Sequence, residues 1–149
     1  MTQHLIQLLM ATLGALGFSL IFNVRGRQLL FTTLGGFLAW SSYLLLEPTG
    51  LGDVGRYLIA SILVTIYAEI CARRRKAPAT VFLMSGVIPL VPGSRLYATM
   101  VYAVNLDWPG FLEQGLHTIL LAGAISAGII LVSTVVHSMQ AVRDLRRQS

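Results

Sequence analysis

The sequence has little charge, one cysteine and none of the common catalytic motifs. Only 11% of its 149 residues are charged, whereas 55% are hydrophobic, and the mean hydropathy is +0.73. A soluble domain of this length needs a much larger charged surface. The composition therefore predicts an integral membrane protein with a single transmembrane domain, residues 1–149.

The missing motifs exclude several classes of chemistry. Because Cys71 stands alone, neither a disulfide nor a CxxC site can form within one chain. His4, His117 and His137 are too scattered in sequence to suggest a metal site. Walker A, G-x-S-x-G and HExxH motifs do not occur, so nothing supports ATP hydrolysis or hydrolase chemistry. We expect a protein that is not an enzyme and that binds neither a metal nor a cofactor.

Five apolar segments are long enough to cross a bilayer, which takes about 20 helical residues. Polar or turn-forming stretches separate them. The first segment does not resemble a signal peptide closely, because Arg25 and Arg27 follow it and no small-x-small cleavage site is present. The predicted fold is all-α, with five transmembrane helices at residues 4–23, 28–46, 56–72, 79–102 and 116–139.

The basic residues predict the orientation of these helices, since cytoplasmic loops are enriched in Lys and Arg. With five crossings, nine of the eleven basic residues share one side: Arg25, Arg27, Arg73, Arg74, Arg75, Lys76, Arg143, Arg146 and Arg147. Glu47, Asp53, Asp107 and Glu113 fall on the other side. We therefore expect the N-terminus outside and the C-terminus in the cytoplasm. Charges in short clusters between apolar runs argue against a nucleic-acid partner despite the net charge of +5.

The fourth span contains the stretch GVIPLVPG, residues 86–93. Proline lacks an N–H, so Pro89 removes the helical hydrogen bond to the Ser85 carbonyl and Pro92 removes the one to Ile88. The interruption falls about ten residues into the span, near the middle of the bilayer. Irregular backbone at that depth is tolerated only where protein buries it or where it lines a watery cavity. A re-entrant segment would put the C-terminal arginines outside, so the charge pattern favours a broken helix that still crosses.

A second half-helix is expected to start after the prolines. Gly93 permits a sharp backbone angle, Ser94 is suited to cap the new helix, and a charge such as Arg95 inside a span usually has a partner or a role. Discontinuous helices form substrate sites in many transporters. We predict such a site from the residues Ser85, Ile88, Pro89, Pro92, Gly93, Ser94 and Arg95. The plainer alternatives are a kinked helix and, for Arg95, snorkelling to the interface or an ion pair.

Polar residues recur every four positions in the third span, at Tyr57, Ser61, Thr65, Glu69 and Arg73. This spacing keeps them on one face of a helix. The face predicts a proton path with Glu69 as carrier, flanked by Thr65 and Ser61. The alternative is that Glu69 pairs with Arg73 while the two hydroxyls bond between helices.

Small residues recur four apart in the first and last spans. The pairs are Ala11 with Ala15, Gly123 with Ala127, and Ala124 with Gly128. Such pairs let helices approach closely. We therefore expect these two spans to form a subunit interface.

Two stretches resemble a known family. VFLMSGVIPLVPGSRLYATM, residues 81–100, resembles the signature of the threonine/serine exporter family. GALGFSLIFNVRGRQLLFTTLGG, residues 14–36, is similar to the first-span region of that family. The specificity of the match depends mainly on PLVPG-x-x-x-Y-x-x-M, from Pro89 to Met100. The residues carried over are Phe22, Asn23, Pro89, Pro92, Gly93, Tyr97 and Met100, which adds Tyr97 to the predicted substrate site.

The length matches the small split subunit of that family, which corresponds to the C-terminal membrane half of the fused exporters. The resemblance implies a five-helix subunit in the bacterial cytoplasmic membrane, working with a larger subunit that carries the other membrane half and a soluble domain. It also implies proton-driven export of a small amino acid or related carboxylate. Members often read Asn-Val-Pro where this chain has Asn23-Val24-Arg25, and Arg95 is a cation where none is expected. An added cation favours a second carboxylate on the substrate. The alternatives are a subunit that only scaffolds a partner's path and a small homo-oligomeric exporter.

Overall fold

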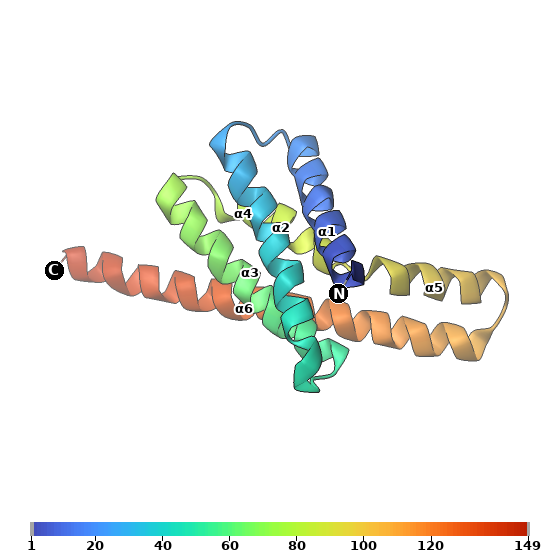
Figure 1. The fold of residues 1–149 in the computed structure, drawn as a ribbon. Helices are drawn as coiled ribbons and strands as arrows, with labels where there is room; N and C mark the ends of the chain where they lie inside the picture. Colours follow the sequence, from blue (N-terminus) through green and yellow to red (C-terminus); the bar gives the residue numbers. More distant parts are fainter. Residues whose placement is uncertain (1, 149) are drawn as a thin grey trace.

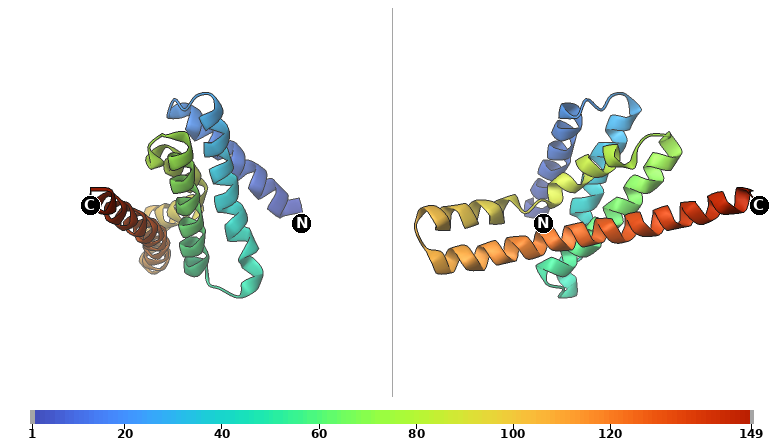
Figure 2. Two further views of the ribbon diagram at one scale, coloured as in Figure 1. Left: turned by 90° about the vertical axis from the view of Figure 1, so that its left-hand side faces the viewer. Right: turned by 180° about the vertical axis from the view of Figure 1, so that it is seen from behind.

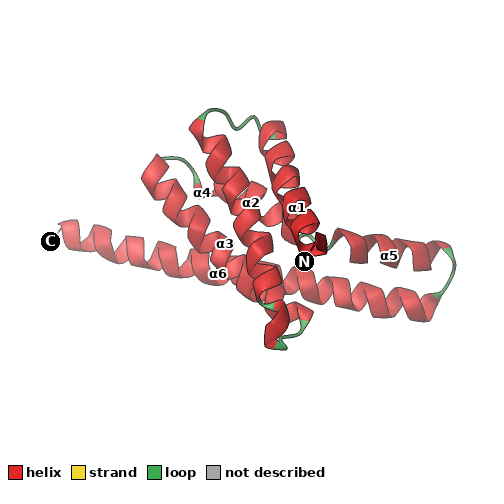
Figure 3. Cartoon of the chain, in the orientation of Figure 1, coloured by secondary structure: helices red, strands yellow, loops and turns green. Residues whose placement is uncertain are grey.

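The computed structural model describes the backbone of residues 2–148 and the side chains of residues 2–140. Over this range the chain is helical and contains no strand (Figure 3). The elements are α1 (Thr2–Ile21), α2 (Arg27–Leu45), the 3₁₀ turn η1 (Glu47–Thr49), α3 (Asp53–Arg75), α4 (Ala79–Val87), the 3₁₀ turn η2 (Ile88–Leu90), α5 (Gly93–Val104) and α6 (Trp108–Gln148). The all-α expectation is confirmed.

Four of these helices are long and apolar enough to span a membrane by themselves: α1, α2, α3 and α6. A fifth span is possible only if α4 and α5 count as one, and these two helices are bent by 54° at the break between them. The helix boundaries match the predicted spans within a few residues, except for the last.

The last helix is much longer than the predicted 116–139. It runs for 41 residues from Trp108, about 60 Å at 1.5 Å per residue. The predicted loop is helical because its sequence suits a helix start: the Asp107 carboxylate accepts a hydrogen bond from the Gly110 N–H at 3.2 Å, and Pro109 is tolerated in the first turn, where its missing N–H is not needed.

The helices form a bundle with a protruding arm (Figure 1). Helices α1, α2 and α3 pack in sequence, α4 lies against α2 and α3, and α6 crosses α3. Helix α5 leaves the bundle and packs along the first part of α6, so the two extend together beyond the other helices (Figure 2). The predicted fourth span thus places its two halves in different surroundings.

Small residues hold the helices together inside the chain. A Cβ added at Gly36 of α2 would collide with Ala15 of α1, and one at Gly128 of α6 would collide with Ser61 of α3. The prediction that both small-residue faces serve a subunit interface is therefore wrong for Ala15 and for the Ala124–Gly128 face, since all three residues are buried within this chain. Gly123 and Ala127 remain exposed.

The two clusters of arginines nearest the N-terminus lie at the same end of the bundle. The connection from α1 to α2 and the one from α3 to α4 are neighbours in Figure 1, and the Arg75 guanidinium lies 4.0 Å from the centre of the Phe31 ring. The connection through η1, with Glu47 and Asp53, is at the opposite end. The side chains of Arg143, Arg146 and Arg147 lie outside the described residues.

Candidate functional site

The broken helix meets the middle of the bundle. Gly86, near the end of α4, packs against Gly35 and Val64, which lie midway along α2 and α3. Pro89 lies against Gly36, and Leu90 is fully buried. The first part of the Pro/Gly motif, from Gly86 to Leu90, is therefore packed against protein, whereas Val91 and Gly93 are exposed.

The backbone at the break differs from the prediction in three ways. The Ile88 carbonyl is not left free, because it accepts a hydrogen bond from the Val91 N–H at 3.1 Å. Gly93 does not need positive φ; the described glycines with positive φ are Gly26 and Gly50. Helix α5 already begins at Gly93 and its start has no side-chain cap, so Ser94 lies inside the first turn and does not cap it.

Arg95 extends from this first turn of α5 to a cluster of polar groups. Its Nη2 lies 3.1 Å from Oδ2 of Asp53, and its Nη1 donates to Oε1 of Gln114 at 3.4 Å. The other Asp53 oxygen, Oδ1, accepts from the Tyr43 hydroxyl at 3.4 Å and lies 4.0 Å from Nη1 of Arg56. Asp53 is thus the centre of contacts from α2, α3, α5 and α6. The ion-pair alternative for Arg95 matches this geometry.

Asp53 is the residue that sequence reasoning missed, since it was placed in an external loop. It is the first residue of α3, where the positive end of the helix dipole favours a carboxylate. The available signal was Arg95 itself, because a cation within an apolar span calls for an anionic partner.

His117 completes the cluster from α6. Its Nε2 lies 3.8 Å from Oδ2 of Asp53, the same oxygen that Arg95 contacts. This nitrogen is buried and has no hydrogen-bond partner among the described side chains. Nearby, the hydroxyls of Thr99 and Thr118 lie 3.5 Å apart and link α5 to α6.

Asp53 and Arg95, with Tyr43 and Arg56, border a polar cavity of about 430 Å³, a volume within the usual range for small-molecule sites. Its lining comes from five helices and the first 3₁₀ turn: Gln3, His4, Gln7, Trp40, Tyr43, Leu44, Glu47, Asp53, Arg56, Tyr57, Ser94, Arg95 and Leu121. The Trp40 indole N–H is buried and has no partner among the described residues. The lining therefore combines cations, two carboxylates and an unpaired donor within an apolar chain.

Only Ser94 and Arg95 of the predicted substrate residues line this cavity. Ser85 is buried in the bundle with an unpaired hydroxyl among the described groups. Tyr97 is 73% exposed and borders a separate shallow pocket with Met100, Val101, Val104 and Asn105. The structure thus does not bring the whole predicted set together.

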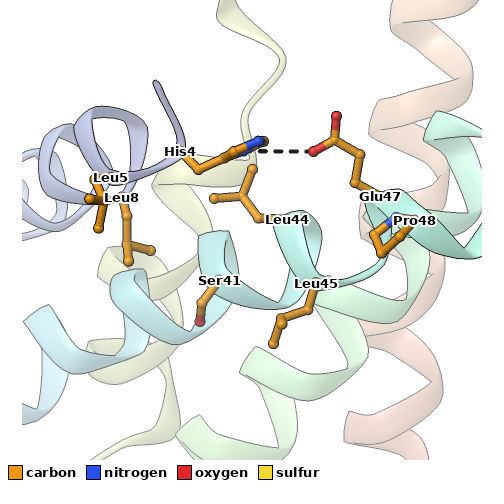
Figure 4. A pocket seen from close by; sticks show the side chains of 8 residues that line it. All are labelled: His4, Leu5, Leu8, Ser41, Leu44, Leu45, Glu47 and Pro48. Carbon is orange, nitrogen blue, oxygen red and sulfur yellow. Dashed lines mark ion pairs between the residues drawn. The ribbon is translucent and has the colours of Figure 1, made fainter. Parts of the chain in front are cut away.

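A second, mostly apolar cavity of about 530 Å³ lies between the start of α1 and the end of α2 (Figure 4). His4 and Glu47 line both cavities, and their Nδ1 and Oε2 atoms are 3.7 Å apart. The other side chains around this second cavity are Leu5, Leu8, Ser41, Leu44, Leu45 and Pro48. The His4–Glu47 pair therefore stands between a polar space and an apolar one.

The polar face of α3 does not reach either cavity beyond Tyr57. Ser61 and Thr65 are buried and donate to carbonyls of their own helix, Leu58 and Ser61, instead of bonding between helices. Glu69 is partly buried, and no ion pair joins it to Arg73 in the described part of the chain. No group of three or more His, Cys, Asp or Glu that could hold a metal occurs among the described residues.

Comparison with known proteins adds the family. No solved structure matches the chain. A family model described as "Threonine/Serine exporter, ThrE" matches residues 7–135. The match extends from α1 into α6 and includes the broken helix, Asp53, Arg95 and His117. With several apolar helices long enough to cross a membrane, the chain belongs to the threonine/serine exporter family and has the transport role of that family.

Proposed function

We propose that this chain is the membrane subunit of a two-component secondary exporter in the bacterial cytoplasmic membrane. Its substrate is a small amino acid like threonine or serine, or a related carboxylate, and export is coupled to protons. The observation that carries the proposal is the charged cavity, where Arg95 and Asp53 meet at the first turn of α5 in a chain with few other charges.

The cavity has the chemistry that a zwitterion requires. A guanidinium binds a carboxylate through a planar fork of donors, so Arg95, supported by Arg56, suits the substrate carboxylate. The start of α5 adds about half a positive charge from the helix dipole. Asp53 suits the substrate ammonium. When the substrate binds, the ion pair between Arg95 and Asp53 is thus replaced by two contacts: Arg95 with the substrate carboxylate and Asp53 with the substrate ammonium.

We propose five crossings, with α4 and α5 acting as one broken span, the N-terminus outside and the C-terminus in the cytoplasm. This orientation puts the arginine-rich connections of the bundle in the cytoplasm and the cavity, with Glu47 and Asp53, toward the outside. Glu69, with Thr65 and Ser61, remains the proposed proton path on the inner side.

The larger partner subunit is proposed to supply the rest of the path. The exposed Gly123 and Ala127 form the small-residue face of α6 that this chain leaves open, and such a face suits close packing against a partner helix. The polypeptide alone is then expected to be inactive. Export from liposomes that contain only this chain would support a homo-oligomer instead.

Flux and substrate binding in the reconstituted complex test the site. Arg95→Gln removes charge-assisted hydrogen bonds and is expected to cost about 1.5–3 kcal/mol of binding free energy, roughly tenfold to a hundredfold in affinity. The matched control is Arg74→Gln in the basic last turn of α3, which is expected to bind like wild type. Wild-type affinity in an assembled Arg95→Gln complex would contradict the proposal.

The same assay tests the proton path. Glutamine keeps the shape of Glu69 but cannot release a proton. Glu69→Gln is expected to reduce pH-driven export while co-elution with the partner is unchanged. Export with an unchanged pH dependence would remove Glu69 from the path.

A further inference from the structure

We propose that His117 is a proton-dependent competitor for Asp53, so that protonation of its ring loosens the ion pair between Asp53 and Arg95. The proposal deepens the proposed function, on which it rests, by assigning the group through which external protons act on the cavity. His117 is a positioning residue here: it acts on the substrate through Arg95 and Asp53.

The competition follows from three atoms contributed by three helices. Oδ2 of Asp53 on α3 lies 3.1 Å from Nη2 of Arg95 on α5 and 3.8 Å from Nε2 of His117 on α6. The two nitrogens therefore approach the same oxygen. At 3.8 Å the histidine lies just beyond hydrogen-bonding distance, and its Nε2 is buried without a partner among the described groups. A small movement of either helix completes the contact.

Protonation changes the charge balance of the cluster. With a neutral ring, two guanidiniums, Arg56 and Arg95, share one carboxylate. A proton taken up from the outer aqueous phase makes both ring nitrogens donors and adds a third cation. The ring then attracts Asp53 and repels Arg95, and both effects favour the release of Arg95.

Among the described residues, Asp53 is the only acidic group within 4.0 Å of His117. The histidine's own helix contributes Gln114, which is neutral and accepts from Arg95. From α2, the Tyr43 hydroxyl donates to the opposite oxygen of Asp53, and from α3 Tyr57 and Arg56 line the polar cavity that Asp53 borders. His4 of α1 and Glu47 of η1, whose Nδ1 and Oε2 atoms are 3.7 Å apart, line that cavity too. His4 is the histidine that lines the cavity itself, so it supplies the control.

The release of Arg95 acts in the direction that export requires. A protonated His117 competes with a substrate ammonium for Asp53, while the freed Arg95 swings away with α5. A proton that arrives from outside thus displaces the amino end of an outgoing zwitterion. Deprotonation restores the ion pair and resets the cavity.

The experiment measures the ion pair without any substrate, so its outcome is independent of whether the cavity transports an amino acid. Spin labels are placed on exposed positions beside the two partners, Val54→Cys on α3 and Leu96→Cys on α5, in the complex with Cys71→Ala. Distances are measured by pulsed electron resonance between about pH 8 and pH 5.5, the range over which histidine changes charge. We expect acid to shift the ratio of close to separated populations by about tenfold, a typical coupling between two sites.

Two variants fix the charge in opposite senses. His117→Gln is expected to keep the labels close at every pH, and His117→Arg to keep them apart at every pH. His4→Gln is the matched control and is expected to retain the wild-type pH response. A pH response that persists in His117→Gln, or one that disappears in His4→Gln alone, would overturn the proposal, as would a wild-type complex whose distances do not change.

Discussion

Substituting Gly128 by alanine tests the closest helix crossing in the chain. This glycine lies where α6 crosses α3, and a Cβ built on it would collide with Oγ of Ser61. It would also lie 3.0 Å from the carbonyl oxygen of Leu58 and 3.2 Å from the backbone nitrogen of Ile62. Because two of these three atoms belong to the backbone of α3, rotating a side chain cannot make room, and the helices must separate.

The size of the effect follows from two opposing terms. Overpacking of a tight contact costs about 1–3 kcal/mol, whereas replacing glycine by alanine inside a helix stabilises it by up to about 1 kcal/mol. In the chain without its partner, Gly123→Ala has the second term alone, because nothing lies within 4 Å of its added Cβ. The difference between the two variants therefore isolates the packing cost, and we expect it to be about 1–3 kcal/mol.

The measurement is the free energy of unfolding in mixed micelles, obtained by titration with a denaturing detergent. Gly128→Ala is expected to unfold at lower denaturant than wild type, and Gly123→Ala at the same or higher denaturant. Adding Ser61→Gly to Gly128→Ala should recover only part of the loss, since the backbone contacts remain. Equal stabilities of the two alanine variants would refute the close approach of α6 to α3.

Two further predictions concern topology and the break. The distribution of basic residues predicts which side of the membrane each loop faces. We expect alkylation from the cytoplasm for single cysteines at 24–27, 74–77 and 143–147, and from outside for those at 48–53 and 108–114. Cytoplasmic labelling at residue 110 would contradict five crossings. Pro89→Ala with Pro92→Ala restores two N–H donors, so it should reduce the 54° bend and abolish substrate binding in a complex that still assembles. Wild-type transport by the double alanine variant would show that the break is only a kink. Gly93→Val should be tolerated, because residue 93 lacks positive φ and open space surrounds it.

The helices themselves could be predicted from the sequence because they follow from the length of the apolar runs. A run of about 20 apolar residues has few alternatives to a helix in lipid, and α1, α2 and α3 start and end close to the expected residues. The start of α6 was missed because Asp107, Trp108, Pro109 and Gly110 look like a turn. The same residues serve equally well as a helix start, and only the contact between the Asp107 carboxylate and the Gly110 N–H separates the two structures.

The packing role of the small residues could not be assigned from spacing alone. Four-residue spacing shows that small side chains share one face of a helix, but it does not show which other helix packs against that face. In the structure α2 covers Ala15 and α3 covers Gly128, while Gly123, one position before the buried Ala124, stays open. Neighbouring positions on one helix thus face different partners, which depends on the three-dimensional order of the helices.

Of the ion pair in the candidate site, Arg95 could be predicted from the sequence and Asp53 could not, and the reason is electrostatic. Arg95 was recognisable because a cation within an apolar span is costly by itself, wherever its partner lies. Asp53 carried no such signal, since a carboxylate near a predicted loop is fully compatible with water. It becomes informative only once α5 places Arg95 within 3.1 Å of it, across 42 residues of sequence. The acid is then stabilised in two ways, by the positive end of α3 and by two guanidiniums. A carboxylate shared between two cations binds each of them less tightly than a single partner would, and in the proposed function this sharing leaves Arg95 available to a substrate carboxylate.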